Sequence, residues 1–161
     1  MTAPGRKQTV GCQLERREYG EMGNKEIVKR YWDGKWNTRR PEILDELQAT
    51  DVTYHGPGLE MTNREEYKQA YGVFRAAFDD TKLTVEDLIE EGDKVVSRVI
   101  VSGVHKGDLP DLPATGRSFS LSLTTIFRLT DGKIVEEHEA YNELDLMAQL
   151  GMELVLKEIT E

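Results

Sequence analysis

The clearest hydrophobic pattern in the chain lies between residues 91 and 151. Residues 95–105 are dense in β-branched side chains, which favour extended backbone. In residues 118–129 one face carries the alternating set Phe119, Leu121, Leu123, Thr125 and Phe127. The dipeptide Asp131-Gly132 is typical of a tight hairpin turn, so residues 134–141 are expected to pair antiparallel with the strand before them. Three strands and a short closing helix are therefore predicted here.

Before residue 91 the apolar spacing changes to that of helices. A stripe from Ile27 to Trp36 predicts a first helix with Asn24 as its cap, and Pro41 suits the start of a second, short helix. A third helix is expected after Thr62, which forms a capping-box pattern with Glu65. Two more strands are predicted, residues 51–55 before the turn Gly56-Pro57-Gly58 and residues 83–89 before the turn at Gly92.

This order of elements predicts an α+β fold. The strands form a curved, mostly antiparallel meander that wraps around three N-terminal helices, and the result is a cone with an apolar interior. Residues 1–22 are polar and show no sustained period, so we expect a flexible N-terminal extension followed by one domain over residues 23–161.

Composition and charge exclude several classes of protein. A formal net charge of −9 argues against sequence-independent nucleic-acid binding, which needs clustered Lys and Arg. No apolar run approaches the length that spans a bilayer and no signal-peptide pattern is seen, so no membrane contact and a cytoplasmic location are expected. Cys12 is the only cysteine, which rules out an internal disulfide and a cysteine-based metal cluster.

Several segments, taken together in their order and spacing, resemble the SnoaL-like family of polyketide and ester cyclases. They are Gly103–Gly107, Leu112–Arg117, Asp131–Glu137 and Gln149–Gly151, and the resemblance covers roughly residues 24 to 152. It implies the nuclear transport factor two-like, or cystatin-like, cone. It also implies ring closure of a polyketide ester by an intramolecular aldol condensation, with an acid/base aspartate and no metal or cofactor.

Two positions depart from the family pattern. Asn142 stands where the closing strand usually ends in an aspartate, and His138 stands where a tryptophan is common. An amide has no exchangeable acid proton near neutral pH, so Asn142 can bind a carbonyl but cannot shuttle an α-proton. Asn142 is also a favourable cap for the helix that follows it, and both roles stay open.

The three histidines of the chain, His55, His105 and His138, all fall on predicted strands, and imidazole titrates near neutral pH. Strand alternation places His105 on the inward apolar face with Val99, and places His138 on the face of Ile134. The histidines lack the short spacing typical of zinc motifs, so no metal is predicted, although a site assembled from distant strands is not excluded.

Two functions are compatible with this sequence. One is a cofactor-free cyclase-type enzyme on a hydrophobic carbonyl or ester compound, with His105 as acid/base and His138 and Asn142 binding carbonyl oxygens. The other is a non-catalytic domain that binds or carries a small hydrophobic molecule. The residues expected to contact the ligand are Trp32, Tyr54, His55 and Phe74. Apolar residues such as Ile100 and Ile126 on the outer sheet face predict a homodimer.

Overall fold

A six-stranded sheet dominates the computed structural model, which describes residues 22–153 and 155. The strands are β1 (Gln48–Gly56), β2 (Leu59–Met61), β3 (Phe78–Glu91), β4 (Lys94–His105), β5 (Ser118–Thr130) and β6 (Lys133–Tyr141). The helices are α2 (Asn24–Trp32), the π-helix η1 (Asp33–Asn37), α3 (Glu42–Leu47), α4 (Arg64–Ala77) and α5 (Glu143–Gln149). The prediction for residues 1–22 lies outside the described residues except at Met22.

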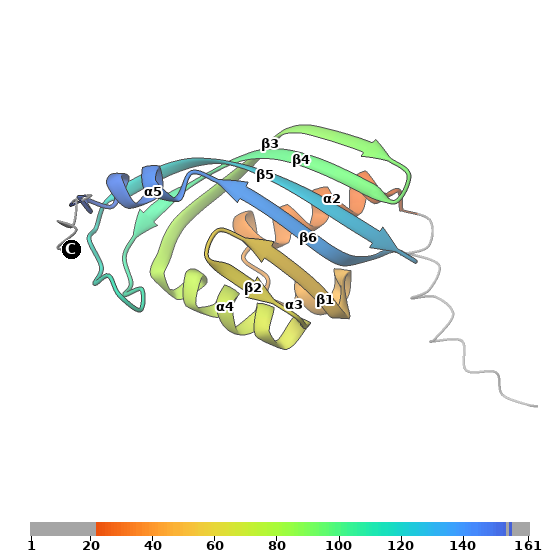
Figure 1. The fold of residues 1–161 in the computed structure, drawn as a ribbon, viewed down its shortest axis with the longest axis horizontal. Coiled ribbons are helices and arrows are strands. Elements are labelled where there is room, and N and C mark those ends of the chain that lie inside the picture. The colour runs from red at the N-terminus through yellow and green to blue at the C-terminus, as the bar shows by residue number, and fades with distance from the viewer. Residues whose placement is uncertain (1–21, 154, 156–161) are drawn as a thin grey trace, which may run out of the picture.

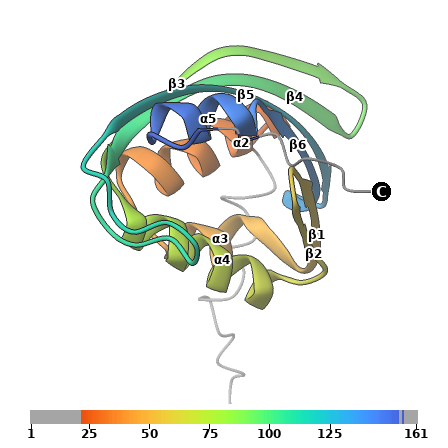
Figure 2. The same ribbon diagram turned by 60° about the vertical axis from the view of Figure 1, so that its left-hand side comes forward.

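The strand order is β2-β1-β6-β5-β4-β3, and every neighbouring pair is antiparallel except β1 and β6. The sheet curves over α2, and α3 and α4 lie on its concave side (Figures 1 and 2). The predicted α+β fold, a curved and mostly antiparallel sheet around N-terminal helices, is confirmed. The parallel pairing of β1 with β6 and the three-residue strand β2 were not predicted.

The helices bury the predicted apolar stripes, but their caps differ from the prediction. Ile27 and Trp32 of α2 are buried, whereas the residue that caps this helix is Gly23 and not Asn24. The N-cap of α4 is Asn63, one residue later than expected, and the Glu66 carboxylate accepts from the Thr62 amide at 2.7 Å. Asn63 accepts a hydrogen bond from the Glu66 amide at 3.0 Å, because its side chain reaches the first turn from the cap position.

A β-bulge in β6 decides which of its side chains face the interior. The register between β5 and β6 shifts so that Val135 is left unpaired between Ile134 and Glu136. Beyond this extra residue the alternation is reversed. Glu137 is therefore buried beneath the sheet and His138 faces outward, whereas simple alternation from Ile134 predicted the opposite.

The inner face of the sheet is otherwise as predicted. Phe119, Leu121, Leu123, Thr125 and Phe127 are all buried, and so is His105 at the end of β4. Across the described ranges, no helix is both long and apolar enough to cross a membrane.

Candidate functional site

A cavity of about 410 Å³ lies between the concave face of the sheet and the helices. Its wall is mostly apolar and aromatic, and the polar side chains on it include Lys35, Tyr54, Tyr67, Glu139 and Tyr141. Its volume falls in the range of about 300–1,000 Å³ that is typical of small-molecule sites. A cavity of this volume has room for a small molecule.

Glu139 places a carboxylate on this wall. Tyr54 donates a hydrogen bond from its hydroxyl to Oε1 of Glu139 at 2.8 Å, and the Thr125 hydroxyl lies 3.3 Å from Oε2. Burial, together with the charge of Glu139, raises the pKa of Tyr54, so its phenol stays a donor at neutral pH. Two donors thus hold the carboxylate in a fixed orientation at the cavity surface.

Tyr141 is a second phenol on the wall, two residues after Glu139 on β6. Burial and then the charge of Glu139 raise the pKa of Tyr141 to about 12. Among the described residues its hydroxyl has no hydrogen-bond partner. This hydroxyl is available to donate to an oxygen atom of a ligand.

A buried polar network centred on Glu137 lies below the cavity. Its carboxylate accepts hydrogen bonds from the hydroxyl of Tyr31 at 2.6 Å, the amide of Gln48 at 3.0 Å and the hydroxyl of Tyr67 at 3.1 Å. Glu137 is completely buried, and this burial raises the pKa of its carboxyl. The positive charge of Lys35, followed by the hydrogen bonds from Tyr31 and Gln48, acts in the opposite direction and favours the carboxylate.

Lys35 connects this network to the cavity. Its ammonium donates to the Tyr67 hydroxyl at 2.6 Å, so that Tyr67 bridges the amine and the Glu137 carboxylate. The side chain is only 6 % exposed, and burial lowers the pKa of the amine. The ammonium lies 4.9 to 5.9 Å from the ring centroids of Tyr31, Trp32, Tyr67 and Tyr71. These rings stabilise the cation through their negative faces.

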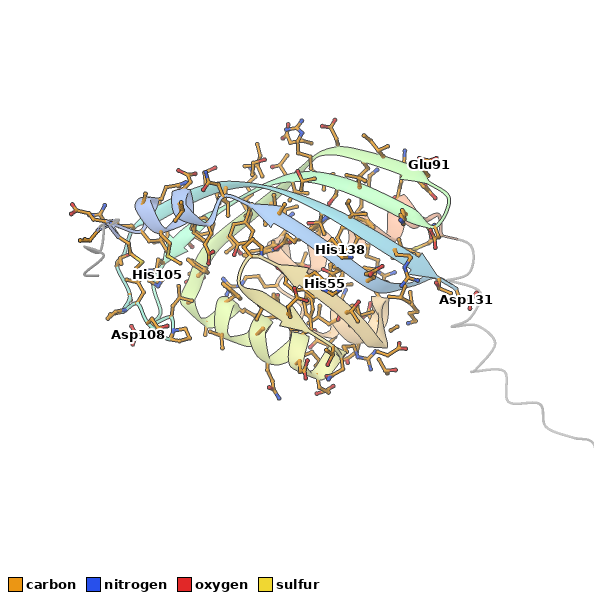
Figure 3. All side chains as sticks on the ribbon, in the orientation of Figure 1. His55, Glu91, His105, Asp108, Asp131 and His138 are labelled. Atoms are coloured by element: carbon orange, nitrogen blue, oxygen red, sulfur yellow. The ribbon has the colours of Figure 1, made fainter. Side chains whose placement is uncertain are left out.

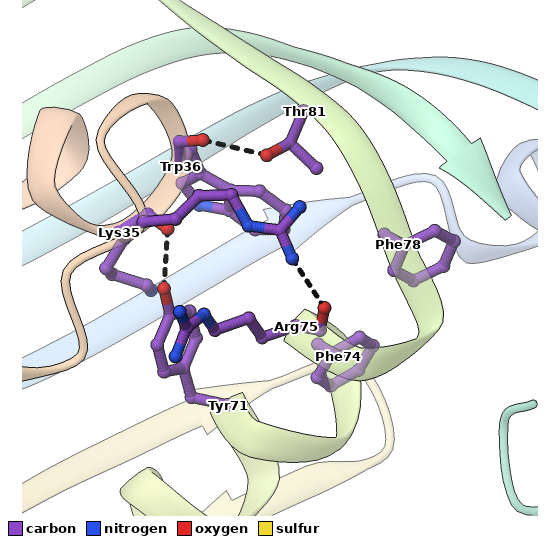
Figure 4. A pocket seen from close by; sticks show the side chains of 8 residues that line it. Lys35, Trp36, Tyr71, Phe74, Arg75, Phe78 and Thr81 are labelled. Carbon is purple, nitrogen blue, oxygen red and sulfur yellow. Dashed lines mark hydrogen bonds between the residues drawn. The ribbon is translucent and has the colours of Figure 1, made fainter. Parts of the chain in front are cut away.

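A small pocket beside the cavity shares several lining residues with it, and hydrogen bonds to backbone oxygens hold its walls in place (Figure 4). Tyr71 donates from its hydroxyl to the carbonyl oxygen of Lys35 at 2.6 Å, and Thr81 donates to that of Trp36 at 2.8 Å. Phe74 and Phe78 stack beside them. These contacts fix the π-helix η1 against α4 and β3, and so fix the position of Lys35.

Of the four residues predicted to contact a ligand, Tyr54 and Phe74 line the cavity. Trp32 does not, because its ring is 1 % exposed, packs edge-on against Phe127 and donates from Nε1 to the hydroxyl of Ser97 at 3.0 Å. The indole is part of the core. The fourth residue, His55, alternates with Tyr54 along β1 and lies on the opposite side of the sheet, away from the cavity lining.

The three residues predicted as catalytic are not brought together. His105 is completely buried beside Phe78, accepts at Nδ1 near Thr115 and is absent from the cavity wall. His138 stacks on His55 with ring centroids 4.4 Å apart, far along the sheet from His105 (Figure 3). Asn142 caps α5, since its side chain accepts from the Asp145 amide at 3.0 Å.

The residues that sequence reasoning missed are charged groups turned inward. Lys35 gave a signal, because it follows Tyr31 by four positions and Trp32 by three on the apolar stripe of the first helix. Glu139 gave none, since the bulge at Val135 that turns it inward has no visible mark in the sequence.

The profile of the SnoaL-like polyketide cyclase family matches residues 26–150. Among curated proteins, the chain is 31 % identical over 126 residues to the aklanonic acid methyl ester cyclase DauD of Streptomyces sp. (strain C5), covering 78 % of this chain and 77 % of that one. It is 32 % identical over 121 residues to the nogalonic acid methyl ester cyclase of Streptomyces nogalater, covering 72 % and 89 %.

Solved structures give the same picture. TsrD from Streptomyces laurentii superposes with a TM-score of 0.71 at 28 % identity, covering 81 % of this chain and 98 % of that one. IdmH from Streptomyces antibioticus, described as a putative polyketide cyclase, has a TM-score of 0.68 at 28 % identity and covers 80 % and 98 %. A SnoaL-like protein from Jannaschia has a TM-score of 0.74 at 19 % identity, which shows a shared fold.

Proposed function

Because this chain belongs to the SnoaL-like polyketide cyclase family, we propose that it closes a ring in an aromatic polyketide ester by an intramolecular aldol reaction, with Glu139 as the general base. The observation that carries this proposal is the Glu139 carboxylate, oriented by Tyr54 on the wall of an apolar cavity. The two curated relatives are named for methyl esters of aklanonic acid and nogalonic acid. A methyl ester of this class is the proposed substrate.

In the proposed reaction Glu139 removes one proton from the substrate and later returns it. The Glu139 carboxylate takes a proton from the carbon between a ketone and the ester, where the conjugate base is a delocalised enolate. That carbon attacks a second carbonyl carbon of the same molecule, and the new C–C bond converts the carbonyl oxygen into an alkoxide. The protonated Glu139 returns its proton to the alkoxide, so product and substrate are isomers.

Tyr141 is proposed to stabilise the negative oxygen that forms during this sequence. Its pKa of about 12 keeps the phenol protonated, and its hydroxyl lies on the same wall as Glu139. A donor held in place in an apolar cavity stabilises developing charge more than a donor in water does. The buried ammonium of Lys35 lies on the same cavity wall and adds positive potential that acts on the Glu139 carboxylate.

The test is turnover of aklanonic acid methyl ester and nogalonic acid methyl ester by the purified chain, followed by chromatography of the cyclised product. Glu139→Gln keeps the size of the side chain but removes the base, and should lower kcat by about 10²- to 10⁴-fold. Glu86→Gln makes the same chemical change at an exposed site on β3 and should retain parent activity. Equal turnover by Glu139→Gln and the parent would refute the assignment.

The second candidate is a non-catalytic domain that binds a small hydrophobic molecule, and the apolar cavity favours it equally. It predicts saturable quenching of tryptophan fluorescence by either ester with no turnover in the parent.

The variant Asn142→Asp tests whether Glu139 or a carboxylate at position 142 acts as the base. Aspartate caps helices as well as asparagine does, so the substitution should leave α5 intact. If Glu139 is the base, turnover should then be unchanged. A rise in turnover would instead favour the family-type carboxylate at position 142.

A cytoplasmic location and a homodimer complete the proposal. Both rest on the sequence: the absence of a recognisable targeting pattern for the first, and the apolar outer sheet face for the second.

A further inference from the structure

Two of the three histidines of the chain face each other on the outer side of the sheet (Figure 3). His55 of β1 and His138 of β6 are register partners in the parallel strand pair, and their rings are inclined by only 17°. Glu136 lies on the same face of β6, with Oε1 3.1 Å from Nε2 of His138. One ligand atom from each of these three residues lies within 4.8 Å of those of the other two.

Two further charged side chains orient this cluster. Glu60 of β2 is the cross-strand partner of His55 and contacts its Nδ1. Arg128 of β5 donates from Nε to Oε2 of Glu136 at 2.8 Å, which leaves Oε1 directed at the histidines. A carboxylate that orients an imidazole, and a cation that fixes a carboxylate, are typical partners of the ligands around metal sites.

We propose that His55, Glu136 and His138 form a binding site for a divalent transition-metal ion, most simply Zn²⁺, on the outer face of the sheet. The site joins β1 to β6, and Glu60 positions the His55 ring from β2. It is separate from the cavity, because Tyr54, Glu137 and Glu139 alternate with these residues along the strands and point inward.

The donor set decides which ions bind. Two imidazole nitrogens and one carboxylate oxygen suit Zn²⁺, Ni²⁺ and Cu²⁺, whereas Ca²⁺ and Mg²⁺ require more oxygen ligands. All three side chains are partly accessible, with His55 at 37 %, Glu136 at 27 % and His138 at 52 % side-chain exposure. In the single chain an ion can therefore enter from solvent and keep water in its fourth position.

We expect ion binding to rearrange the three side chains and to leave the backbone in place. Zn–N and Zn–O bonds of about 2.0–2.2 Å place tetrahedral ligand atoms ~3.4 Å apart, so donors spread over as much as 4.8 Å must move closer. Rotation of the two partly accessible rings out of their stacked arrangement would bring the donors closer together. The strands that carry the three ligands are held by the backbone ladder of the sheet.

The site also has a structural consequence for the cavity. The turn between β1 and β2 contains Pro57 and Gly58, and these residues line the cavity wall together with Leu59, the first residue of β2. A metal ion that joins His55 to β6 would hold the β1–β2 hairpin against β6. We expect the ion to act as a clip that stabilises the cavity edge, and not as a participant in chemistry inside it.

The experiment uses the full chain, purified without a histidine tag and treated with EDTA. Calorimetric titration with Zn²⁺ should show one ion per chain, and Mg²⁺ should show no binding. Loss of a residue that only orients a metal ligand typically lowers metal affinity by 10- to 100-fold. His55 and His138 are proposed as direct ligands, so His55→Gln and His138→Gln should each weaken Zn²⁺ binding by at least about tenfold. Glu86→Gln is the control on a distant surface, and its affinity should equal that of the parent.

Thermal unfolding gives a second measurement. At a free Zn²⁺ concentration a hundred times the Kd, the midpoint of the parent should rise by roughly 5–10 °C, and that of the double variant His55→Gln/His138→Gln should not. Equal affinity in the parent and the double variant would overturn the site. So would a ratio of one ion per two chains, which would place the ion between copies of the protein.

Discussion

The pair of buried charges formed by Lys35 and Glu137 allows a quantitative test of the structure. The change Lys35→Met keeps an unbranched apolar stem of similar length but removes the cation that faces the Glu137 carboxylate through Tyr67. Loss of one partner of a buried ion pair costs about 3–5 kcal/mol. Glu137 keeps its three hydrogen bonds and can take up a proton, so we expect about 3 kcal/mol at pH 7.

The pH dependence of this loss follows from the direction of the pKa shift. Burial raises the pKa of Glu137 in the folded chain, and removing Lys35 leaves that effect less opposed. The folded variant then binds more protons than the unfolded chain between the unfolded pKa, about 4.3, and the higher folded value. The contribution of Glu137 to stability is therefore greatest below its pKa in the unfolded chain, and it is lost as the pH rises through its pKa in the folded chain. The deficit of Lys35→Met should be smaller at pH 5 than at pH 8.

The assay is urea unfolding followed by tryptophan fluorescence at these two pH values. Lys29→Met makes the same change on the exposed side of α2 and should shift the free energy of unfolding by less than about 1 kcal/mol. The double variant Lys35→Met/Glu137→Gln removes both charges and should lose about 2 kcal/mol less than the sum of the single variants. Strict additivity, or the same deficit at both pH values, would show that the two groups do not interact as charges.

The other predictions concern single contacts and assembly. Tyr54→Phe removes the donor to Glu139 and should lower kcat about tenfold, measured with the ester substrates, with little change in thermal midpoint. Gly107→Ala should destabilise the chain by at least about 2 kcal/mol in urea, since its Cβ would lie 2.2 Å from the carbonyl oxygen of Ala76. Asn142→Ala removes the cap of α5 and should cost about 1 kcal/mol by the same assay. Ile126, 42 % exposed on the outer sheet face, belongs to the predicted dimer surface, and light scattering that shows a monomer at micromolar concentration would argue against it.

The parts of the fold that were predictable are those in which one face of an element is buried over its whole length. The alternation from Phe119 to Phe127 identified the inner face of β5, and the stripe from Ile27 to Trp32 identified that of α2. In both cases local backbone preference and burial agree, so a sequence alone carries the information. The parallel pairing of β1 with β6 joins segments far apart in the chain, and no local pattern specifies it.

The site was less predictable because its central residues break the usual relation between charge and exposure. Glu137 and Lys35 are charged side chains in the core, and they are tolerated only because Tyr31, Gln48 and Tyr67 satisfy them. These partners come from helices and strands that meet only in the folded chain. The histidines attracted attention as titrating groups, yet titration alone does not reveal the side of a strand on which a residue lies.

The bulge at Val135 connects these two outcomes. This one extra residue makes Ile134 and Glu137 both face inward, and it thereby turns Glu139 toward the cavity and His138 toward solvent beside His55. A regular β6 that kept Ile134 buried would move Glu139 out of the cavity and place the His138 imidazole in the apolar interior. Such a regular strand would lose every hydrogen bond to Glu137 and would bury the His138 ring without a partner, and both changes are unfavourable. The buried network therefore specifies the bulge, and the bulge in turn sets the proposed base and the proposed metal ligands on opposite faces of a single strand.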